Sequence, residues 1–186
     1  MVDSRRMDRG VTEMQDPARD NRKVFVIHGR NEGLRRSMFE FLWALDLRPV
    51  EWIDLVRQYA HGSPYIGDLL DYAFSTAQGV VVLMTPDERV ELTLGSDREE
   101  GFQARPNVIF EAGMALARDP KRTVIVEVGL LRPFSDVAGR HKLRLDDDGL
   151  EGRVGRRQDL AQRLQAMGCP VRLEGQGWHN TGSFRV

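Results

Sequence analysis

Several features that would assign this chain to a particular class of protein are scarce or missing. Cys169 is the only cysteine, which excludes an internal disulfide and any metal site built from several cysteines, and it fits a reducing cytosol. No apolar run is long enough to span a bilayer, and the N-terminus lacks the hydrophobic core of a signal peptide. The net charge of −1 gives no global attraction to nucleic acid or to an anionic membrane. We therefore expect a cytoplasmic protein whose partners include neither nucleic acid nor a membrane.

Motifs for phosphate and metal binding are also missing. The chain has no Walker A sequence, and the turn after its first predicted strand is not a G-x-G-x-x-G fingerprint. Its histidines, including His28 and His61, are scattered without the spacing of metal ligands. The run Asp146-Asp147-Asp148 lacks the spaced ligands and terminal glutamate of an EF-hand loop, so we interpret it as a solvated turn. We predict no metal site.

An alternation of strand and helix patterns organises what is present. Short apolar runs rich in β-branched residues predict strands buried on both faces, whereas apolar residues at a spacing of three and four predict helices. Strands are predicted at 24–27, 48–52, 79–84, 123–128 and 142–145, and helices from 32, from 64 with Ser63 as N-cap, from 107, and at 156–167. We divide the chain into a charged, disordered tail (1–22), one domain (23–168) and a C-terminal extension (169–186) that no pattern places.

This alternation predicts an α/β domain with a five-stranded parallel sheet and helices on both faces. The flavodoxin-like strand order 2-1-3-4-5 would open the loops after the first and third strands on one crevice, where ligands bind in such folds. The first loop is His28–Asn31, and the second lies within 85–107. Residues 86–106 are predicted to be a long polar connection, and loops of that length are often functional.

The stretch N-V-I-F-E-A-G-M-A-L-A (Asn107–Ala117) is apolar apart from Glu111 near its middle. Burying an unpaired carboxylate is costly, so Glu111 needs a partner or a purpose. Asn107 is a predicted N-cap, which would place Glu111 near the end of the first turn, where the helix dipole favours a carboxylate. Two interpretations stay open: Glu111 faces a ligand in the crevice, or it pairs with Arg105 or Arg30 and locks two loops together.

Other candidates near the crevice carry weaker signals. Gly29 would allow a close backbone approach, and Arg30 would meet a phosphate, although arginine is more often a surface residue. Trp52 and Tyr65 flank the loop after the second predicted strand, which contains His61, and would stack on a base, while core packing explains Trp52 equally well. His28 is interpreted more simply as a structural histidine.

Four motifs, in this order and spacing, resemble the predicted nucleotide-binding proteins with a TIR-like domain, a group that includes TIR effectors of bacterial anti-phage cyclic-nucleotide systems. The motifs are V-F-V-I-H-G-R-N-E, V-V-V-L-M-T-P-D, R-P-N-V-I-F-E-A-G and F-S-D-V-A-G. The resemblance covers about Lys23 to Met167. The family often has E-L-G or E-F-G where this chain has Glu111-Ala112-Gly113, and its loop after the third strand is commonly less acidic.

This resemblance implies a TIR-like fold and cleavage of NAD+ to nicotinamide and linear or cyclic ADP-ribose, with NAD+ as substrate and no cofactor. The glutamate of the family's N-V-I-x-E motif is catalytic and maps onto Glu111. The residues that would contact the dinucleotide are His28, Gly29, Arg30, Asn31, Trp52, Tyr65, Arg105 and Asn107. The resemblance also implies self-association through the TIR-like domain. Family members are commonly fused to a cyclic-nucleotide sensor, for which this chain has no room, so a separate sensor chain is a further expectation.

The chemistry of NAD+ cleavage suits a lone carboxylate. Nicotinamide departs neutral, so no general acid is required, unlike in ordinary glycosidases with their two carboxyl groups. One ionised glutamate would hold the ribose hydroxyls and stabilise the oxocarbenium-like charge. Two alternatives remain: a non-catalytic nucleotide-binding or assembly module, and nucleoside deoxyribosyl transfer, which uses a similar layout and a glutamate.

Overall fold

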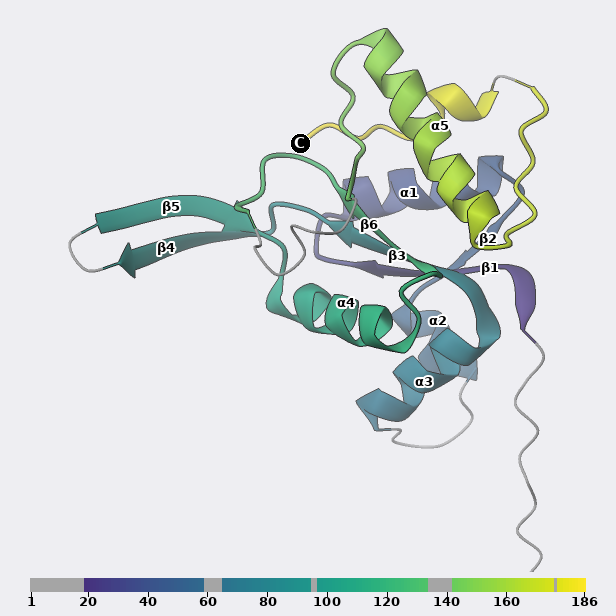
Figure 1. Cartoon of the computed structure of the whole chain (residues 1–186), viewed down its shortest axis with the longest axis horizontal. Helices are drawn as coiled ribbons and strands as arrows, with labels where there is room; N and C mark the ends of the chain where they lie inside the picture. The colour runs from purple at the N-terminus through teal and green to yellow at the C-terminus, as the bar shows by residue number, and fades with distance from the viewer. Residues whose placement is uncertain (1–18, 59–64, 95–96, 134–141, 176) are drawn as a thin grey trace, which may run out of the picture.

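The computed structural model of the chain describes residues 19–58, 65–94, 97–133, 142–175 and 177–186. A parallel five-stranded sheet lies at its centre (Figure 1). The order β2-β1-β3-β6-β7 is the predicted 2-1-3-4-5 order, with β4 and β5 outside the sheet. The strands of the sheet are β1 (Asp20–His28), β2 (Arg48–Val50), β3 (Ala77–Met84), β6 (Thr123–Glu127) and β7 (Leu143–Arg144). The predicted α/β fold is confirmed.

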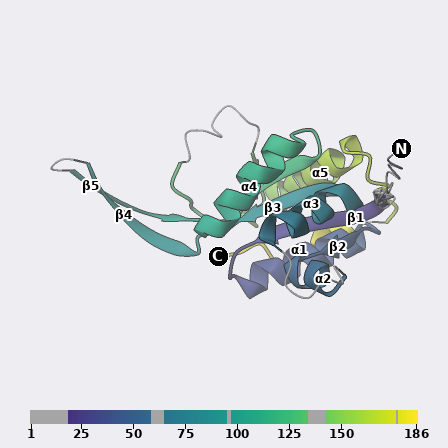
Figure 2. The same cartoon turned by 90° about the horizontal axis from the view of Figure 1, so that it is seen from below.

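Helices cover both faces of this sheet (Figures 1 and 2). On one face lie α1 (Glu32–Ala44) and α5 (Leu150–Ala166), and on the other lie α2 (Trp52–Gln58), α3 (Ile66–Thr76) and α4 (Pro106–Arg118). Two hydrophobic cores result, one on each side. Along β1, Val24 and Val26 enter the first core, while Phe25 and Ile27 enter the second. Successive strand residues point to opposite faces, so a strand between two helix layers must be apolar throughout.

The predicted apolar faces of the helices form these cores. In α1 the five residues at helical spacing are all buried: Leu34, Met38, Phe41, Leu42 and Leu45. In α3 the predicted residues Leu69, Leu70 and Ala73 are buried as well. Helix α4, which carries Glu111, contacts both β1 and β3 and therefore lies over the middle of the sheet.

The long polar connection predicted for 86–106 is wrong. Strands β4 (Glu88–Leu94) and β5 (Asp97–Gln103) form an antiparallel hairpin that projects from the body of the molecule (Figures 1 and 2). Its exposed charges pair across the strands, Arg89 with Glu100 and Arg98 with Glu91. The sequence of β5 lacks the alternation of apolar and polar residues that marks a half-buried strand, because both faces of a projecting hairpin are in contact with solvent.

Several predicted boundaries also move. Strand β1 begins at Asp20, inside the segment expected to be a tail, and α5 begins at Leu150 rather than at 156. The second strand ends at Val50, and Trp52 begins a short helix that was not predicted. Ser63 and Pro64, predicted to start a helix, lie outside the described residues, and Tyr65 is the N-cap of α3.

The C-terminal residues that the sequence left unplaced pack against α1 and α5. Trp178, in the short 3₁₀ helix η2 (Gly177–Asn180), and Phe184 are buried, and each ring centroid lies 6.4 Å from that of Phe41. The backbone N–H of Ser183 donates to Ser37 Oγ at 3.0 Å. This segment therefore completes the core on the α1 side of the sheet.

A buried ion pair joins α5 to this segment. The fully buried Arg157 donates to Asp147 Oδ1 at 2.7 Å and to the carbonyl of Gly182 at 2.8 Å, and its guanidinium lies 4.9 Å from the Phe184 ring centroid. Burial alone would raise the pKa of Asp147, but hydrogen bonds from Arg157 and from the backbone of Phe184 lower it. The interpretation of Asp146–Asp148 as a solvated turn is wrong for Asp147, whose side chain is only 4% exposed.

Candidate functional site

A pocket of about 440 Å³ opens between the end of β1, the start of α2 and the first two turns of α4. This is the crevice that the strand order predicts. Its lining brings together six of the nine predicted site residues and adds Phe25, Val26, Ile27, Val108 and Phe110. The six are His28, Gly29, Trp52, Arg105, Asn107 and Glu111. The volume lies within the range of small-molecule sites in proteins.

The loops after β1 and β3 meet through Asp87. Its Oδ1 accepts the backbone N–H of Arg30 at 3.3 Å, and its Oδ2 accepts from Thr85 Oγ1 at 3.0 Å. A Cβ placed on Gly29 would overlap the Asp87 carboxylate, so a larger residue would displace that side chain from its hydrogen bonds to Arg30 and Thr85. Gly29 therefore does permit a close approach, and the approaching group is Asp87.

Helix α4 carries Glu111 to the pocket, but not in the predicted way. Arg105 is the N-cap and Pro106 the first helical residue, so the prediction of Asn107 as N-cap is wrong. Proline is favoured at this position because its fixed φ suits a helix start and its missing N–H is not needed there. Asn107 is the second helical residue, and Glu111 lies on the second turn rather than the first.

Glu111 is half-buried at the pocket wall. Across the described residues its carboxylate has neither a hydrogen bond nor an ion pair, so the predicted alternative of pairing with Arg105 or Arg30 is not formed there. Burial raises the pKa of Glu111, and the charges of His28 and Arg105 act in the opposite direction. The result is a partly desolvated carboxylate that faces a cavity and has no direct partner among the described residues, with Arg105 and His28 acting on it through space.

His28 has both ring nitrogens engaged. Nε2 lies 2.8 Å from Glu51 Oε2, and Nδ1 lies 2.9 Å from the carbonyl oxygen of Gly29. Glu51 Oε1 also accepts from Arg35 at 3.2 Å, and Arg35 in turn pairs with Glu32 at 2.8 Å. A chain of four ionisable side chains thus runs from the surface of α1 to the pocket.

Three predicted substrate contacts lie away from the pocket lining. Asn31 caps α1, its Oδ1 accepting the Leu34 N–H at 3.0 Å, so it has a structural role. Arg30 is exposed at the crevice edge, and the ring of Tyr65 is exposed before α3. The sequence reasoning missed Phe110, which lines the pocket although 64% of it is exposed. The sequence feature that could have indicated Phe110 is a bulky aromatic residue directly before Glu111.

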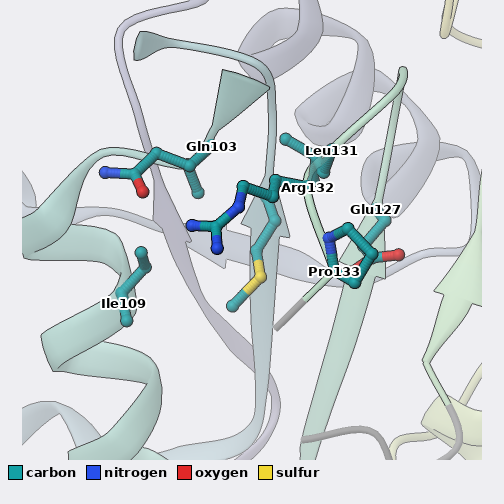
Figure 3. Close-up of a pocket in the computed structure, with 8 residues that line it drawn as sticks. Gln103, Ile109, Glu127, Leu131, Arg132 and Pro133 are labelled. Atoms are coloured by element: carbon teal, nitrogen blue, oxygen red, sulfur yellow. The ribbon is translucent and has the colours of Figure 1, made fainter. Parts of the chain in front are cut away.

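A second, smaller cavity of about 60 Å³ lies at the ends of β3 and β6, and Figure 3 shows its lining residues. Ile109 enters it from α4 and Glu127 from β6. Glu127 is paired there: Lys142 Nζ donates to its Oε1 at 2.7 Å. The two half-buried glutamates therefore differ in that Glu127 has a cation in contact and Glu111 has none among the described residues.

Neither a metal cluster nor a membrane helix is found in the part of the chain that the structure describes. No group of three or more His, Cys, Asp or Glu side chains is placed to hold a metal ion there. No described helix has both the length and the apolar character needed to cross a bilayer.

Together the 2-1-3-4-5 sheet, the two helix layers and the pocket at the strand-order reversal define a TIR-like α/β protein. Residues 23–147 match the family described as "CAP12/Pycsar effector protein, TIR domain", and the chain belongs to this family of bacterial anti-phage effectors.

Curated relatives are more distant. The "Uncharacterized protein YuaY" of Escherichia coli (strain K12) is 26% identical over 151 residues, which is 81% of this chain and 47% of that protein. The "Protein tirC" of Dictyostelium discoideum is 28% identical over 105 residues, 55% of this chain and 50% of that protein. The chain thus spans about half the length of the curated relatives it matches.

Proposed function

We propose that this chain is an NAD+ glycohydrolase of anti-phage defence, with Glu111 as its catalytic residue. The observation that carries the proposal is the state of Glu111: a partly desolvated carboxylate without a contact partner among the described residues, on the wall of a ligand-sized pocket. A structural carboxylate in such a place normally has a partner, because an unpaired buried charge is costly. A carboxylate kept for chemistry must be left free to meet the substrate.

The reaction requires little else from the protein. The bond between the ribose C1′ and the nicotinamide nitrogen breaks, its electron pair leaves with nicotinamide, and positive charge develops on the ribose. An ionised Glu111 stabilises that charge and holds the ribose hydroxyls. Water, or a nucleophilic atom of the same ADP-ribose in the cyclic case, adds to C1′, and a proton passes to solvent. Because the leaving group is neutral, the lack of a second carboxylate in the pocket lining is no obstacle.

The rest of the pocket suits a dinucleotide. Trp52 and Phe110 offer aromatic surface at its wall and rim, and Arg105 adds positive charge at the start of α4. A planar, cationic nicotinamide ring is attracted to aromatic faces, and the pyrophosphate to a cation at a helix N-terminus. Asn107 lies one turn before Glu111 and would orient the ribose. Self-association of TIR-like domains, expected from the family resemblance, would then set the activity.

Nicotinamide release from NAD+ tests the proposal directly. We would measure it with purified protein at low and high concentration, alongside Glu111→Gln and the matched control Glu127→Gln, which makes the same substitution at the paired glutamate. We expect release by wild type, increasing more than proportionally with protein concentration, retained by Glu127→Gln and lost in Glu111→Gln.

Other outcomes identify other functions. Saturable NAD+ binding without nicotinamide release at any concentration would favour a non-catalytic nucleotide-binding or assembly module. Activity on nucleosides with none on NAD+ would indicate deoxyribosyl transfer. Full activity in a folded Glu111→Gln variant would remove Glu111 from the mechanism.

A further inference from the structure

The hydrogen bonds of His28 determine how many protons its ring holds. Its two partners, the Glu51 carboxylate and the Gly29 carbonyl, are both acceptors, at 2.8 Å and 2.9 Å. A neutral imidazole has a single N–H, so either neutral tautomer would place a lone pair against one of these oxygens. Only the doubly protonated ring donates to both. The contact between Glu51 and Arg35 favours this arrangement, because it holds Glu51 as an anion beside the ring.

The backbone of Glu51 is fixed by the start of α2. Its N–H donates to Asp54 Oδ2 at 3.1 Å, and its carbonyl accepts the N–H groups of Asp54 and Leu55 at 3.1 and 3.2 Å. A residue at such a position usually turns its side chain to the first amides of the helix. The Glu51 side chain instead reaches His28 and Arg35, with about a fifth of its surface exposed.

Arg35 is itself held from two other sides. Its Nε donates to Glu32 Oε2 at 2.8 Å, and its guanidinium lies 5.3 Å from the ring centroid of Phe39. Strand β1 thus ends in His28, the residue just before α2 contributes Glu51, and α1 contributes Arg35 and Glu32. Because both ring nitrogens are used by the protein, His28 offers the pocket no N–H for a ligand.

We propose that Glu51, held by Arg35, is a positioning residue that keeps His28 doubly protonated and oriented so that its charge faces Glu111. The charged groups around this ring are Glu51, Arg35 and Glu32 on one side and Glu111 with Arg105 across the pocket. The cation keeps Glu111 ionised although the site is partly desolvated. The effect of His28 on catalysis by Glu111 rests on the proposed NAD+ hydrolysis, whereas the protonation of His28 does not.

The first arm of the test measures the ring itself. Nitrogen-15 NMR of histidine-labelled full-length protein at pH 7 distinguishes a protonated from an unprotonated ring nitrogen, and His28→Gln assigns the His28 signals among the four histidines. We expect both His28 nitrogens to be protonated in wild type and one to lose its proton in Glu51→Gln. The matched control Glu32→Gln removes the outer partner of Arg35 and should leave the ring unchanged. An unprotonated His28 nitrogen in wild type overturns the proposal, whatever the effect of Glu51→Gln.

The second arm measures turnover. If His28 keeps Glu111 ionised, His28→Gln moves the acid limb of the pH profile of kcat/KM to higher pH, and Glu51→Gln slows nicotinamide release while Glu32→Gln does not. An acid limb that stays in place in His28→Gln rejects the electrostatic role. If wild type releases no nicotinamide, the proposed function fails, and the NMR arm still decides the role of Glu51.

Discussion

The surroundings of a fully buried charge and of a half-buried one differ sharply in this molecule. Arg157 of α5 faces the C-terminal segment, with a carboxylate, three backbone carbonyls and an aromatic ring around it. Glu111 lies at the pocket wall, and within the described residues nothing is bonded to its carboxylate. The pKa of Asp147, the partner of Arg157, is lowered, whereas the pKa of Glu111 is raised by burial.

The Arg157 charge therefore stabilises the fold, whereas the Glu111 charge is partly desolvated without a bonded partner among the described residues. Around Arg157 the protein replaces nearly every hydrogen bond that water would have made, which is the condition for burying a charge. Around Glu111 the cavity leaves that task to solvent or to a ligand. Substitutions at Arg157 should therefore lower stability, whereas substitutions at Glu111 should lower activity.

The largest effect is expected at Arg157. Arg157→Met keeps the length of the side chain but leaves Asp147 buried without its cation, which should lower the free energy of unfolding by about 3–5 kcal/mol. Urea unfolding followed by circular dichroism measures this. Asp148→Asn is the matched control, since Asp148 is an exposed neighbour paired with Arg156, and should leave stability unchanged. A loss in Arg157→Met no larger than in the control would show that the pair contributes nothing to the fold.

A smaller loss of stability is expected from a substitution of Gly29, where the loops after β1 and β3 meet beside the pocket. Gly29→Ala places a methyl group against the Asp87 carboxylate, which must move and lose its hydrogen bonds to the Arg30 N–H and to Thr85. Overpacking of this kind typically costs about 1–3 kcal/mol, and loosening of the loop beside the pocket would weaken NAD+ binding as well. Thermal unfolding and a KM measurement test this. Unchanged stability and KM would mean that the Asp87 contact is not maintained in solution.

The third prediction has the opposite sign. Gly113 lies in α4 two residues after Glu111, and a Cβ there meets nothing within 4 Å. Gly113→Ala should therefore stabilise the protein by about 0.5–1 kcal/mol through the better helix propensity of alanine. Thermal unfolding is again the measurement. A destabilised Gly113→Ala would reveal a neighbour for this position, such as a second copy of the chain against α4.

The smallest effect is a pH dependence of stability. Because the folded-state pKa of Glu111 is raised, its ionisation disfavours the folded state as pH rises through the unfolded value and then the folded one. Asp147 behaves oppositely: its stabilisation is present above the unfolded value and is lost as pH falls through its lowered folded pKa. Unfolding measured from pH 4 to 8 should show Glu111→Gln equal to or more stable than wild type at pH 7. This gain should shrink towards pH 4, and a gain that does not change with pH would argue against the raised pKa.

The sheet and its helices followed from the sequence because their periods are uninterrupted. Residues 24–27 and 79–84 are apolar without a break, as expected of strands covered on both faces, and the face of α1 repeats at helical spacing. From the resulting strand order the position of the crevice followed too, and with it the meeting of His28, Gly29 and Glu111.

What the sequence did not reveal depends on contacts rather than on periods. Pro106 displaced the helix start from Asn107, and only the backbone shows which of two good start signals is used. The hairpin has no buried face to mark its alternation. The bond between His28 and Glu51 joins residues 23 positions apart, across a strand end that was predicted two residues too late. Such pairings become visible only when β1 and α2 are placed in space.

One paired measurement on Glu111→Gln decides between a functional and a structural glutamate: nicotinamide release from NAD+ and the free energy of unfolding, both at pH 7 and at high protein concentration. Glutamine keeps the size of the side chain and removes its charge. We predict that nicotinamide release is lost while the free energy of unfolding is unchanged or higher. A variant that is clearly less stable but, while folded, releases nicotinamide at the wild-type rate would contradict this and make Glu111 a structural residue.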